Sequence, residues 1–581
     1  MPTSLIDAES VLAVDIGAMH TRAILFDVVD GQYRFVAAGK AFSTAAAPWR
    51  EVSEGVRDAI VHLEAITGRT LLTSDHRLIM PAQDGTGVGS FVATISAGPI
   101  LRTVVAALLE DVSLASVQRL ARTTYARVVE TISLNDRRKP EEQVDTLLRL
   151  QPDLILIAGG TDGGASRSLQ SLLEIIGLGC YLLPAEKRPA ILFAGNQDMA
   201  RVAEKYLQTL SLSMYVAPNL RPVLDEEDLL PAQHALAALY VRLRAGQLAG
   251  MDELAAWAGE QLWPTAYAAG RIIRFLSQGY SKGILHVDIG ASATALAAGF
   301  SGDLKTGVYP QFGLGEGMAS LLRYTTLEDV LRWLPLELSA EMVQDYLYHK
   351  SLYPTTIPVT VEELAIEQAV ARQALQLAFA SLSADFPRQA LRPAPGYPPY
   401  FDPVLASGSV LTAAPTLGQA LLILLDGLQP LGMTTIVLDQ QNLLAALGAT
   451  AGRVPILPVQ VLDSGAFAVL ATVVAPVVTA RPGTPVLRAR LITQSGRETT
   501  LEVKQGTLET MPLPPGDSGR LLLQPLHRAD VGFGPGRGGE VPVSGTVFGI
   551  VFDARGRPLF LPTDGGRRRE MIKKWLWTLG G

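Results

Sequence analysis

Two stretches of the sequence, LAVDIGAMHT (Leu12–Thr21) and LHVDIGASAT (Leu285–Thr294), repeat one pattern far apart in the chain. Each begins with apolar residues, continues with Asp-Ile-Gly-Ala and reaches Thr after two more residues. The apolar run predicts a buried strand, and the glycine predicts a tight turn into a second strand. The repeat therefore predicts a duplicated α/β fold whose two halves open with the same β-hairpin.

Both hairpins carry residue types that suit the binding of nucleoside phosphates. A glycine at the turn lets backbone N–H groups approach an anion closely, and a hydroxyl can donate to a phosphate oxygen. Asp15 and Asp288, at the strand tips, would each hold a water of Mg²⁺, because Mg²⁺ keeps most of its waters and uses few carboxylates. Two facing hairpins would hold a triphosphate from both sides. The residues that we expect to line the phosphates are Gly17, Thr21, Gly290, Ser292 and Thr294.

Two other residues of the first hairpin have more than one interpretation. Arg22 would offset phosphate charge, or would be an outward-facing strand residue. His20 would act as an electrophile beside a phosphate, although a lone histidine without a fixed partner is weak evidence. The paired hairpins as a whole predict a nucleoside triphosphate with Mg²⁺, and Asp15 and Asp288 as metal-associated catalytic residues.

The composition is that of a globular protein with several domains. The residues are 48% hydrophobic and 18% charged, a composition that excludes a disordered chain. The length of 581 residues is more than one hydrophobic core can accommodate. The net charge of −7 offers no electrostatic case for nucleic acid, and the single cysteine, Cys180, excludes a disulfide within the chain. The longest apolar run, Ala466–Ala480, contains Pro476 and is shorter than the ~20 residues of a spanning helix. We therefore expect a cytoplasmic protein with no membrane and no nucleic-acid partner.

The order of helical and strand-like patterns divides the chain into three parts. Residues 10–270 are expected to form a first half with a helical insertion near 45–135. Residues 271–452 are expected to form a second half with a helical insertion near 326–395. In residues 453–581, strand patterns alternate with Pro- and Gly-rich turns, which predicts a C-terminal all-β domain that ends in a helix.

Two local patterns refine this division. In the first insertion, apolar residues at three- and four-residue spacing predict one long helix over Val104–Val129. In the β domain, GFGPGRGG (Gly532–Gly539) looks like a phosphate cradle but does not open a helix after a strand. We therefore interpret it as a loop, which could still bind a partner.

A Gly-rich loop, IAGGTDGG (Ile157–Gly164), follows an apolar strand and precedes a helix. Loops at the carboxyl ends of strands are where open α/β sheets bind ligands. Asp162 in this loop would orient the attacking water. Alternatively, Asp162 would be a turn residue that caps the following helix.

The same motifs, in the same order, resemble the superfamily of actin, the heat-shock ATPases and the sugar kinases. DIGAMHTR (Asp15–Arg22) and DIGASAT (Asp288–Thr294) resemble its two phosphate motifs, and Ile157–Gly164 lies where its first connecting segment is expected. GLGEG (Gly313–Gly317) resembles a helix start that reaches the nucleoside, and VLASGSVLT (Val404–Thr412) resembles the adenosine motif. The resemblance implies a duplicated actin-like (ribonuclease H-like) fold, and it implies that the nucleotide is ATP. It adds the nucleotide-binding candidates Gly315, Glu316, Gly408 and Ser409, although Glu316 could simply favour a helix N-terminus.

A closer resemblance, over nearly the full chain, is to the MutL family associated with glutamate mutase, which is distinct from the mismatch-repair protein of the same name. It rests on VDIG with its later Thr, on PDLILIAGGTDGG and AGN, and on the C-terminal run from DVGFGPGRGG to RRREMIKKWLW. The resemblance implies an ATP-driven, chaperone-like reactivase whose partner is a B12-dependent carbon-skeleton mutase. Where family members have a small hydroxyl residue, this chain has Ala18, Met19 and His20, so we expect a weak ATPase.

Two other classes of function fit the same motifs. An actin-like assembly or scaffold protein would use the nucleotide to set its assembly state, with the insertions and the β domain as contact surfaces. A small-molecule kinase would need a base carboxylate near the terminal phosphate, and Asp162 would serve. A homo-oligomer is compatible with each of these functions.

Overall fold

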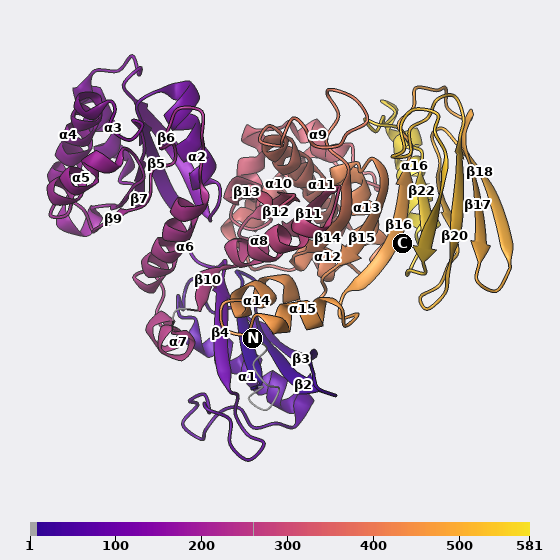
Figure 1. Cartoon of the computed structure of the whole chain (residues 1–581), viewed down its shortest axis with the longest axis horizontal. Coiled ribbons are helices and arrows are strands. Elements are labelled where there is room, and N and C mark those ends of the chain that lie inside the picture. The colour runs from indigo at the N-terminus through magenta and orange to yellow at the C-terminus, as the bar shows by residue number, and fades with distance from the viewer. Residues whose placement is uncertain (1–8, 260, 581) are drawn as a thin grey trace.

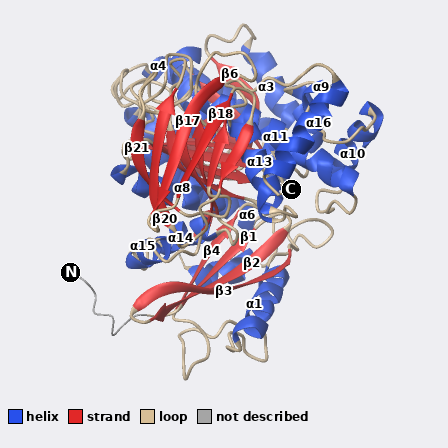
Figure 2. Cartoon of the chain, turned by 90° about the vertical axis from the view of Figure 1, so that its right-hand side faces the viewer, coloured by secondary structure: helices blue, strands red, loops and turns tan. Residues whose placement is uncertain are grey.

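The computed structural model describes residues 9–259 and 261–580. Figure 1 shows the first half at the bottom, the second half in the centre, the C-terminal strands at the right and an inserted domain at the upper left. The view in Figure 2 shows the long strand β3 (Gln32–Phe42) crossing the first half above α1 (Ser53–Thr67). In the part of the chain that the structure describes, every helix is too short or too polar to cross a membrane.

The first sheet confirms the first predicted hairpin. β1 (Val11–Ile16) pairs antiparallel with β2 (His20–Val29) and parallel with β4 (Ser90–Ile95). With β3 and β10 (Leu262–Pro264), the strand order is β10-β4-β1-β2-β3. All residues of β1 are buried, as its nearly continuous apolar run predicts for a strand covered on both faces.

The second half repeats this topology. β11 (Gly283–Ile289) pairs antiparallel with β12 (Thr294–Phe300) and parallel with β14 (Phe401–Ser407). β13 (Asp303–Tyr309) and β15 (Gly432–Leu438) complete the order β13-β12-β11-β14-β15. Because both halves have the same strand order and the same directions, the chain has a duplicated actin-like α/β fold, as predicted.

The two halves meet through equivalent helices. α8 (Thr265–Leu276) follows the fifth strand of the first half, and α14 (Leu443–Thr450) follows the fifth strand of the second. They cross so closely that a Cβ on Gly448 would lie 1.9 Å from the carbonyl oxygen of Ala268. α14 also packs on β1 and β4 of the first half, so the hairpins of both halves are held on one side of this crossing.

The inserted domain is not the expected helical insertion. Residues 101–216 form a parallel sheet in the order β6-β5-β7-β8-β9. Its strands are β5 (Leu101–Ala107), β6 (Ala126–Ser133), β7 (Leu154–Ile157), β8 (Ala190–Phe193) and β9 (Ser213–Val216). Its helices are α3 (Pro140–Leu150), α4 (Ser166–Leu182) and α5 (Ala200–Leu207).

The helix predicted over Val104–Val129 is therefore wrong. The segment contains most of β5, a π-helical turn, the short helix α2 (Ala115–Ala121) and the start of β6. A fully buried strand has a continuous apolar run, which periodicity alone does not separate from a buried helix. Two helices, α6 (Leu230–Ala245) and α7 (Met251–Ala258), lead back from the insertion to the first sheet.

The second insertion is helical, as predicted. α9 (Leu327–Leu331), α10 (Ala340–Leu352) and α11 (Val361–Ser383) lie between β13 and β14. After β14, α12 (Ser409–Thr412) and α13 (Leu417–Leu428) lead to β15. α11 packs on α13 and on β12, which covers one face of the second sheet.

The C-terminal segment is mostly strands, but it does not begin as a separate domain. After α15 (Ile456–Leu462), three strands extend the second half's sheet to eight strands: β16 (Ala468–Ala475), β22 (Ile550–Asp553) and β19 (Leu508–Met511). An antiparallel sheet of four strands packs beside them: β17 (Pro485–Thr493), β18 (Glu498–Lys504), β20 (Ser518–Pro525) and β21 (Gly539–Ser544). The closing helix is α16 (Gly565–Thr578).

A buried ion-pair network fixes this segment to the second half. Arg555 contacts Asp426 of α13 at 2.7 Å and Asp553 of β22 at 2.8 Å. Arg372 of α11 lies 2.7 Å from the other oxygen of Asp426. The Gly-rich loop 532–539 joins β20 to β21 and is turned around the Asp530 carboxylate, which accepts from the amides at 532 and 534.

Candidate functional site

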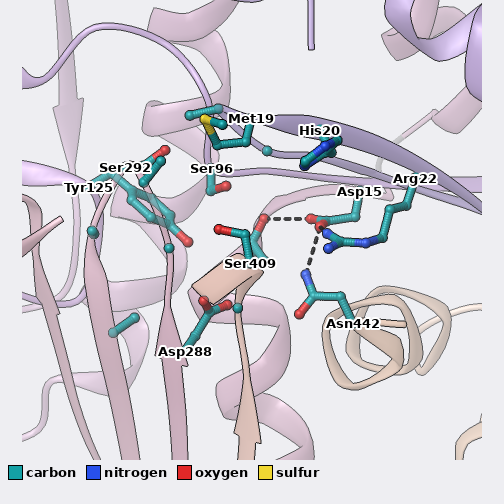
Figure 3. Close-up of a pocket in the computed structure, with 18 residues that line it drawn as sticks. Asp15, Met19, His20, Arg22, Ser96, Tyr125, Asp288, Ser292, Ser409 and Asn442 are labelled. Atoms are coloured by element: carbon teal, nitrogen blue, oxygen red, sulfur yellow. Dashed lines mark hydrogen bonds and ion pairs between the residues drawn. The ribbon is translucent and has the colours of Figure 1, made fainter. Parts of the chain in front are cut away.

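The two hairpin turns face each other across one small polar cavity of about 50 Å³. Their turns have the same hydrogen bond: the Gly17 amide donates to the His20 carbonyl at 3.0 Å, and the Gly290 amide donates to the Ala293 carbonyl at 3.1 Å. The turn tips of both hairpins line the cavity (Figure 3). The expected site residues that the structure brings together here are Asp15, Gly17, Arg22, Asp288, Gly290, Ser292, Gly408 and Ser409.

Asp15 is the most heavily hydrogen-bonded of these residues. Its Oδ1 accepts from the hydroxyls of Thr94 at 2.7 Å and Thr265 at 3.0 Å. Its Oδ2 accepts from the Asn442 side-chain amide at 2.6 Å and lies 3.8 Å from Arg22. Since Asn442 belongs to the second half, this bond ties the two halves together at the cavity (Figure 3).

Asp288 lies across the cavity from Asp15 (Figure 3). Burial and the negative charge of Asp15 raise its pKa from 3.8 to about 7, although Arg22 and a hydrogen bond from Ser407 oppose the rise. Burial likewise raises the pKa of Asp439 to about 6. For both buried carboxylates, Asp288 and Asp439, the charge of Arg22 opposes the rise in pKa. The site carries negative charge that a bound cation would offset.

This donor set fits a magnesium ion held mainly through water. Among the described residues there is no group of three or more His, Cys, Asp or Glu side chains that could hold a metal directly. Mg²⁺ needs few protein carboxylates when phosphates and waters supply the other ligands. Asp288 and Asp15 would therefore hold Mg²⁺ waters, with the hydroxyl of Ser292 and the turn backbones available to phosphate oxygens.

Gly408 is required by its surroundings. Its φ is +101°, and a Cβ there would lie 2.4 Å from the carbonyl oxygen of Ile289 at the end of β11. The strand-to-helix turn after β14 can therefore approach the second hairpin only without a side chain. This places Ser409, the first residue of α12, on the cavity.

Four expected phosphate or nucleoside residues lie outside the cavity: Thr21, Thr294, Gly315 and Glu316. Thr294 is fully buried and its hydroxyl donates to the Phe312 carbonyl at 2.8 Å. Thr21 is buried within β2. The Gly315 amide donates to the Ala291 carbonyl at 3.0 Å, so this glycine supports the second turn. Thr21 and Thr294 were predicted from their positions after a turn, and Gly315 from the resemblance of Gly313–Gly317 to a helix start. The Thr294 hydroxyl and the Gly315 amide are instead used by the fold.

Glu316 lines a second pocket of about 280 Å³ that adjoins the cavity. The two share Ala18, Ala291 and Ser292. The pocket continues along residues 45–47 and 98–100 of the first half. The predicted position of Glu316 beside the phosphate site is therefore consistent with a ligand that extends out of the cavity.

Asp162 does not reach the cavity, which corrects its assignment to the catalytic site. It lies at the carboxyl end of β7 in the inserted sheet, where Oδ1 accepts from the Asn219 amide at 2.8 Å and the Gln197 backbone at 3.0 Å. It does not cap α4 either, because that helix begins after Ala165 without a side-chain cap. The connecting segment of the first half is instead β10 and α8, which supply Thr265.

His20 lines the cavity as a neutral side chain. Burial and the charges of Lys40 and Arg22 lower its pKa to about 4. Its ring stacks on Phe42 at 5.4 Å. A neutral imidazole held in this way can donate one hydrogen bond but does not supply a positive charge at neutral pH.

Several lining residues were not expected from the sequence. The lining residues Ser96, Tyr125, Thr265 and Asn442 come from segments that carry no phosphate-binding pattern of their own. The same holds for two buried residues behind the lining: Thr94, which donates to Asp15, and Asp439. Thr265 directly follows the strand β10 and begins α8, and this strand-to-helix step was a usable signal for it. Nothing local distinguishes Tyr125, which lies between α2 and β6.

A family model described as MutL protein matches residues 11–465. The chain belongs to the MutL family. Within it, Protein MutL of Clostridium tetanomorphum is 24% identical over 309 residues, which are 49% of this chain and 64% of that protein. The match to this curated MutL relative thus spans less than two thirds of its length.

Solved structures similar to this MutL-family chain have low identity. The nucleotide-free structure of acetone carboxylase is 12% identical, covers 86% of this chain and 81% of that one, and has a TM-score of 0.32. The nucleotide-free diol dehydratase-reactivating factor is 10% identical, covers 69% and 92%, and has a TM-score of 0.26. The fold assignment rests on the repeated strand order and hairpins of the chain itself.

Proposed function

We propose that this MutL-family protein is an ATPase that binds Mg²⁺–ATP between its halves and acts as a chaperone-like reactivase on a B12-dependent carbon-skeleton mutase. The observation that supports the nucleotide site most strongly is the pair of hairpin turns, with the same backbone hydrogen bond, around one cavity. The mutase as partner rests on membership of the MutL family. Bound ATP would supply the phosphoanhydride whose hydrolysis drives the cycle.

The chain's own residues divide the work between charge and position. Asp15 and Asp288 would hold waters of the metal, Arg22 would offset phosphate charge, and Ser292 would donate to a phosphate oxygen. Gly17, Gly290 and Gly408 line the cavity and would leave the turn backbones open to the phosphates. Catalysis of this kind is mostly positioning and electrostatics, which these rigid strand ends provide.

Access to the cavity requires the two halves to move. Ligand pockets of about 300–1,000 Å³ are typical for molecules of this size, whereas this cavity is about 50 Å³ and its neighbour about 280 Å³. The hydrogen bond from Asn442 to Asp15 holds the second half against the first half at the cavity. We infer that entry of a nucleotide breaks this bond, and that the opening and closing of the halves is the motion passed to the partner.

The nucleotide site is tested by calorimetric ATP binding and by ATP hydrolysis with Asp15→Asn and Asp288→Asn. Asp303→Asn is the matched control, because Asp303 is an exposed turn residue of the same sheet that contacts Lys305. We expect both site variants to lose at least about tenfold in affinity for Mg²⁺–ATP, as loss of a charged contact predicts, and the control to match the parent. Parent-like affinity in both variants would refute the site.

The partner is tested separately. The purified protein should restore turnover to an inactivated B12-dependent mutase from the same organism when ATP and fresh cofactor are present, and Asp288→Asn should not. Failure of the parent to restore activity or to retain the mutase in a pull-down would refute the reactivase role without touching the nucleotide site. A small-molecule kinase is less well supported, because its candidate base, Asp162, lies in the inserted sheet.

A further inference from the structure

The inserted domain is joined by the chain to the first half but touches the second half. In the segment from α2 to β6, the Arg122 carbonyl accepts from the Val308 amide of β13 at 2.6 Å. Arg122 and Arg119 also lie 3.6 and 3.7 Å from the Asp385 carboxylate, just after α11. These ion pairs are partly exposed, and such pairs contribute little on their own. The inserted domain thus contacts the second half through one backbone hydrogen bond, two weak ion pairs and the apolar packing of Val308 beside Ala126.

Tyr125 extends from this same segment into the phosphate cavity. Among the described residues that line the cavity, it is the one contributed by the inserted domain. Its side chain is 6% exposed, and Figure 3 shows its ring beside Ser292 with the hydroxyl on the side of Asp288. It is at the hairpin end of the site, because the adjoining pocket that Glu316 lines does not include it.

The tyrosine ring is held rigidly. It packs against Tyr240 of α6 at 5.7 Å between ring centroids, and the Arg244 guanidinium lies 4.7 Å above the Tyr240 ring. Arg244 in turn lies against Gly98, in the segment that enters the inserted domain. The position of the Tyr125 side chain therefore depends on how the inserted domain is oriented on the first half.

The hydroxyl of Tyr125 is a donor that the cavity leaves available. Burial and the charges of Asp288 and Asp15 raise its pKa well above the ordinary value, so the phenol keeps its proton. The Ala266 backbone amide donates to the phenol oxygen, which leaves the proton of the hydroxyl free for an acceptor. A phosphate oxygen in the cavity would accept from it, as it would from Ser292.

We propose that the Tyr125 hydroxyl donates a hydrogen bond to the terminal phosphate of bound ATP and thereby couples the nucleotide state to the position of the inserted domain. This rests on the proposed function, since it requires a nucleotide between the hairpins. With the triphosphate bound, the phosphate holds Tyr125 and its segment in place. After hydrolysis that contact is lost, and the remaining contacts to Asp385 and Val308 let the inserted domain move.

Tyr125→Phe removes only the hydroxyl group and so tests its proposed hydrogen bond to the terminal phosphate. Affinities for Mg²⁺–adenylyl imidodiphosphate and Mg²⁺–ADP are measured by calorimetry beside Tyr181→Phe, a control in the same domain whose side chain is 64% exposed on α4. We expect Tyr125→Phe to lose about tenfold for the triphosphate, as for a hydrogen bond to a charged group. Its ADP affinity and melting temperature should match the control. An unchanged ratio of the two affinities overturns the contact.

The coupling is tested by the distance between spin labels at Gln170→Cys on α4 and Glu341→Cys on α10, in a Cys180→Ala background. We expect the distance to differ between the triphosphate and ADP states in the parent and to be the same in Tyr125→Phe. A difference that persists in Tyr125→Phe, or none in the parent, overturns the coupling. If the parent binds neither nucleotide, the proposed function itself fails; if it binds both and Tyr125→Phe behaves as the control, this inference alone fails.

Discussion

Asp288→Asn should stabilise the nucleotide-free protein at neutral and higher pH while it removes tight binding of Mg²⁺–ATP. Burial and the charge of Asp15 raise the pKa of Asp288 from 3.8 to about 7. Between these two values the folded state binds more protons than the unfolded state, so the free energy of unfolding falls as pH rises. At about 1.4 kcal/mol per pKa unit, the ionised carboxylate costs about 4 kcal/mol above pH 7. Asparagine does not titrate and avoids this cost.

The assay is thermal unfolding without nucleotide or metal, from pH 5 to pH 8, for the parent, Asp288→Asn and the control Asp303→Asn. At pH 5 the parent's Asp288 is mostly protonated and resembles asparagine, so the melting temperatures should nearly coincide. The gap should widen to about 10 °C at pH 8, because the parent loses about 4 kcal/mol and 1 kcal/mol corresponds to roughly 2–4 °C for domains of 150–250 residues.

Two results would refute this reasoning. Parallel melting curves for the parent and Asp288→Asn across the whole pH range would mean that the carboxylate is not destabilised by burial and by Asp15. A variant that is more stable but binds Mg²⁺–ATP as well as the parent would show that the destabilised charge serves something other than the nucleotide. The expected combination of greater stability and lost binding is the usual signature of a functional site.

Three further changes separate the site from its surroundings. Asp162→Ala should leave the rate of ATP hydrolysis within about twofold of the parent. It should increase hydrogen exchange in the inserted domain, because it removes the hydrogen bonds to Asn219 and to the Gln197 backbone. A large loss of hydrolysis would show that Asp162 is catalytic after all. Gly408→Ala should lower both the melting temperature and ATP affinity, because its Cβ would lie 2.4 Å from a backbone oxygen, and parent-like values in both measurements would contradict this. His20→Asn should leave the shape of the pH–rate profile from pH 6 to 8 unchanged, because the pKa of His20 is about 4; a lost inflection in that range would contradict it.

Much of the fold was predictable because its signals are local. The run of apolar residues followed by Asp-Ile-Gly-Ala specifies a strand and a turn within ten residues, and two copies specify a duplicated fold. The helical second insertion followed from its periodicity. In the inserted sheet, the strand β7 and the helix α4 after its Gly-rich loop were predicted. β5 was not, because a buried strand has the same unbroken apolar run as a buried helix.

The candidate site was predictable only in part for the same reason. Every βα unit places polar residues at the carboxyl end of a strand, and the local sequence does not say to which sheet that strand belongs. Asp162 and Thr265 both follow strands, yet one lies in the inserted sheet and the other bonds to Asp15. Strand order, which depends on long-range pairing, decides between them.

The sequence by itself determined the two phosphate hairpins, their glycines and the aspartates at their tips, because each is encoded in consecutive residues. Only the tertiary structure decided how these aspartates behave. It buries Asp15 and Asp288 around one cavity, which raises the pKa of Asp288, and it brings in Asn442 from the second half and Tyr125 from the inserted domain. Electrostatic interaction depends on distance in space, and that distance exists only once the two halves have packed together.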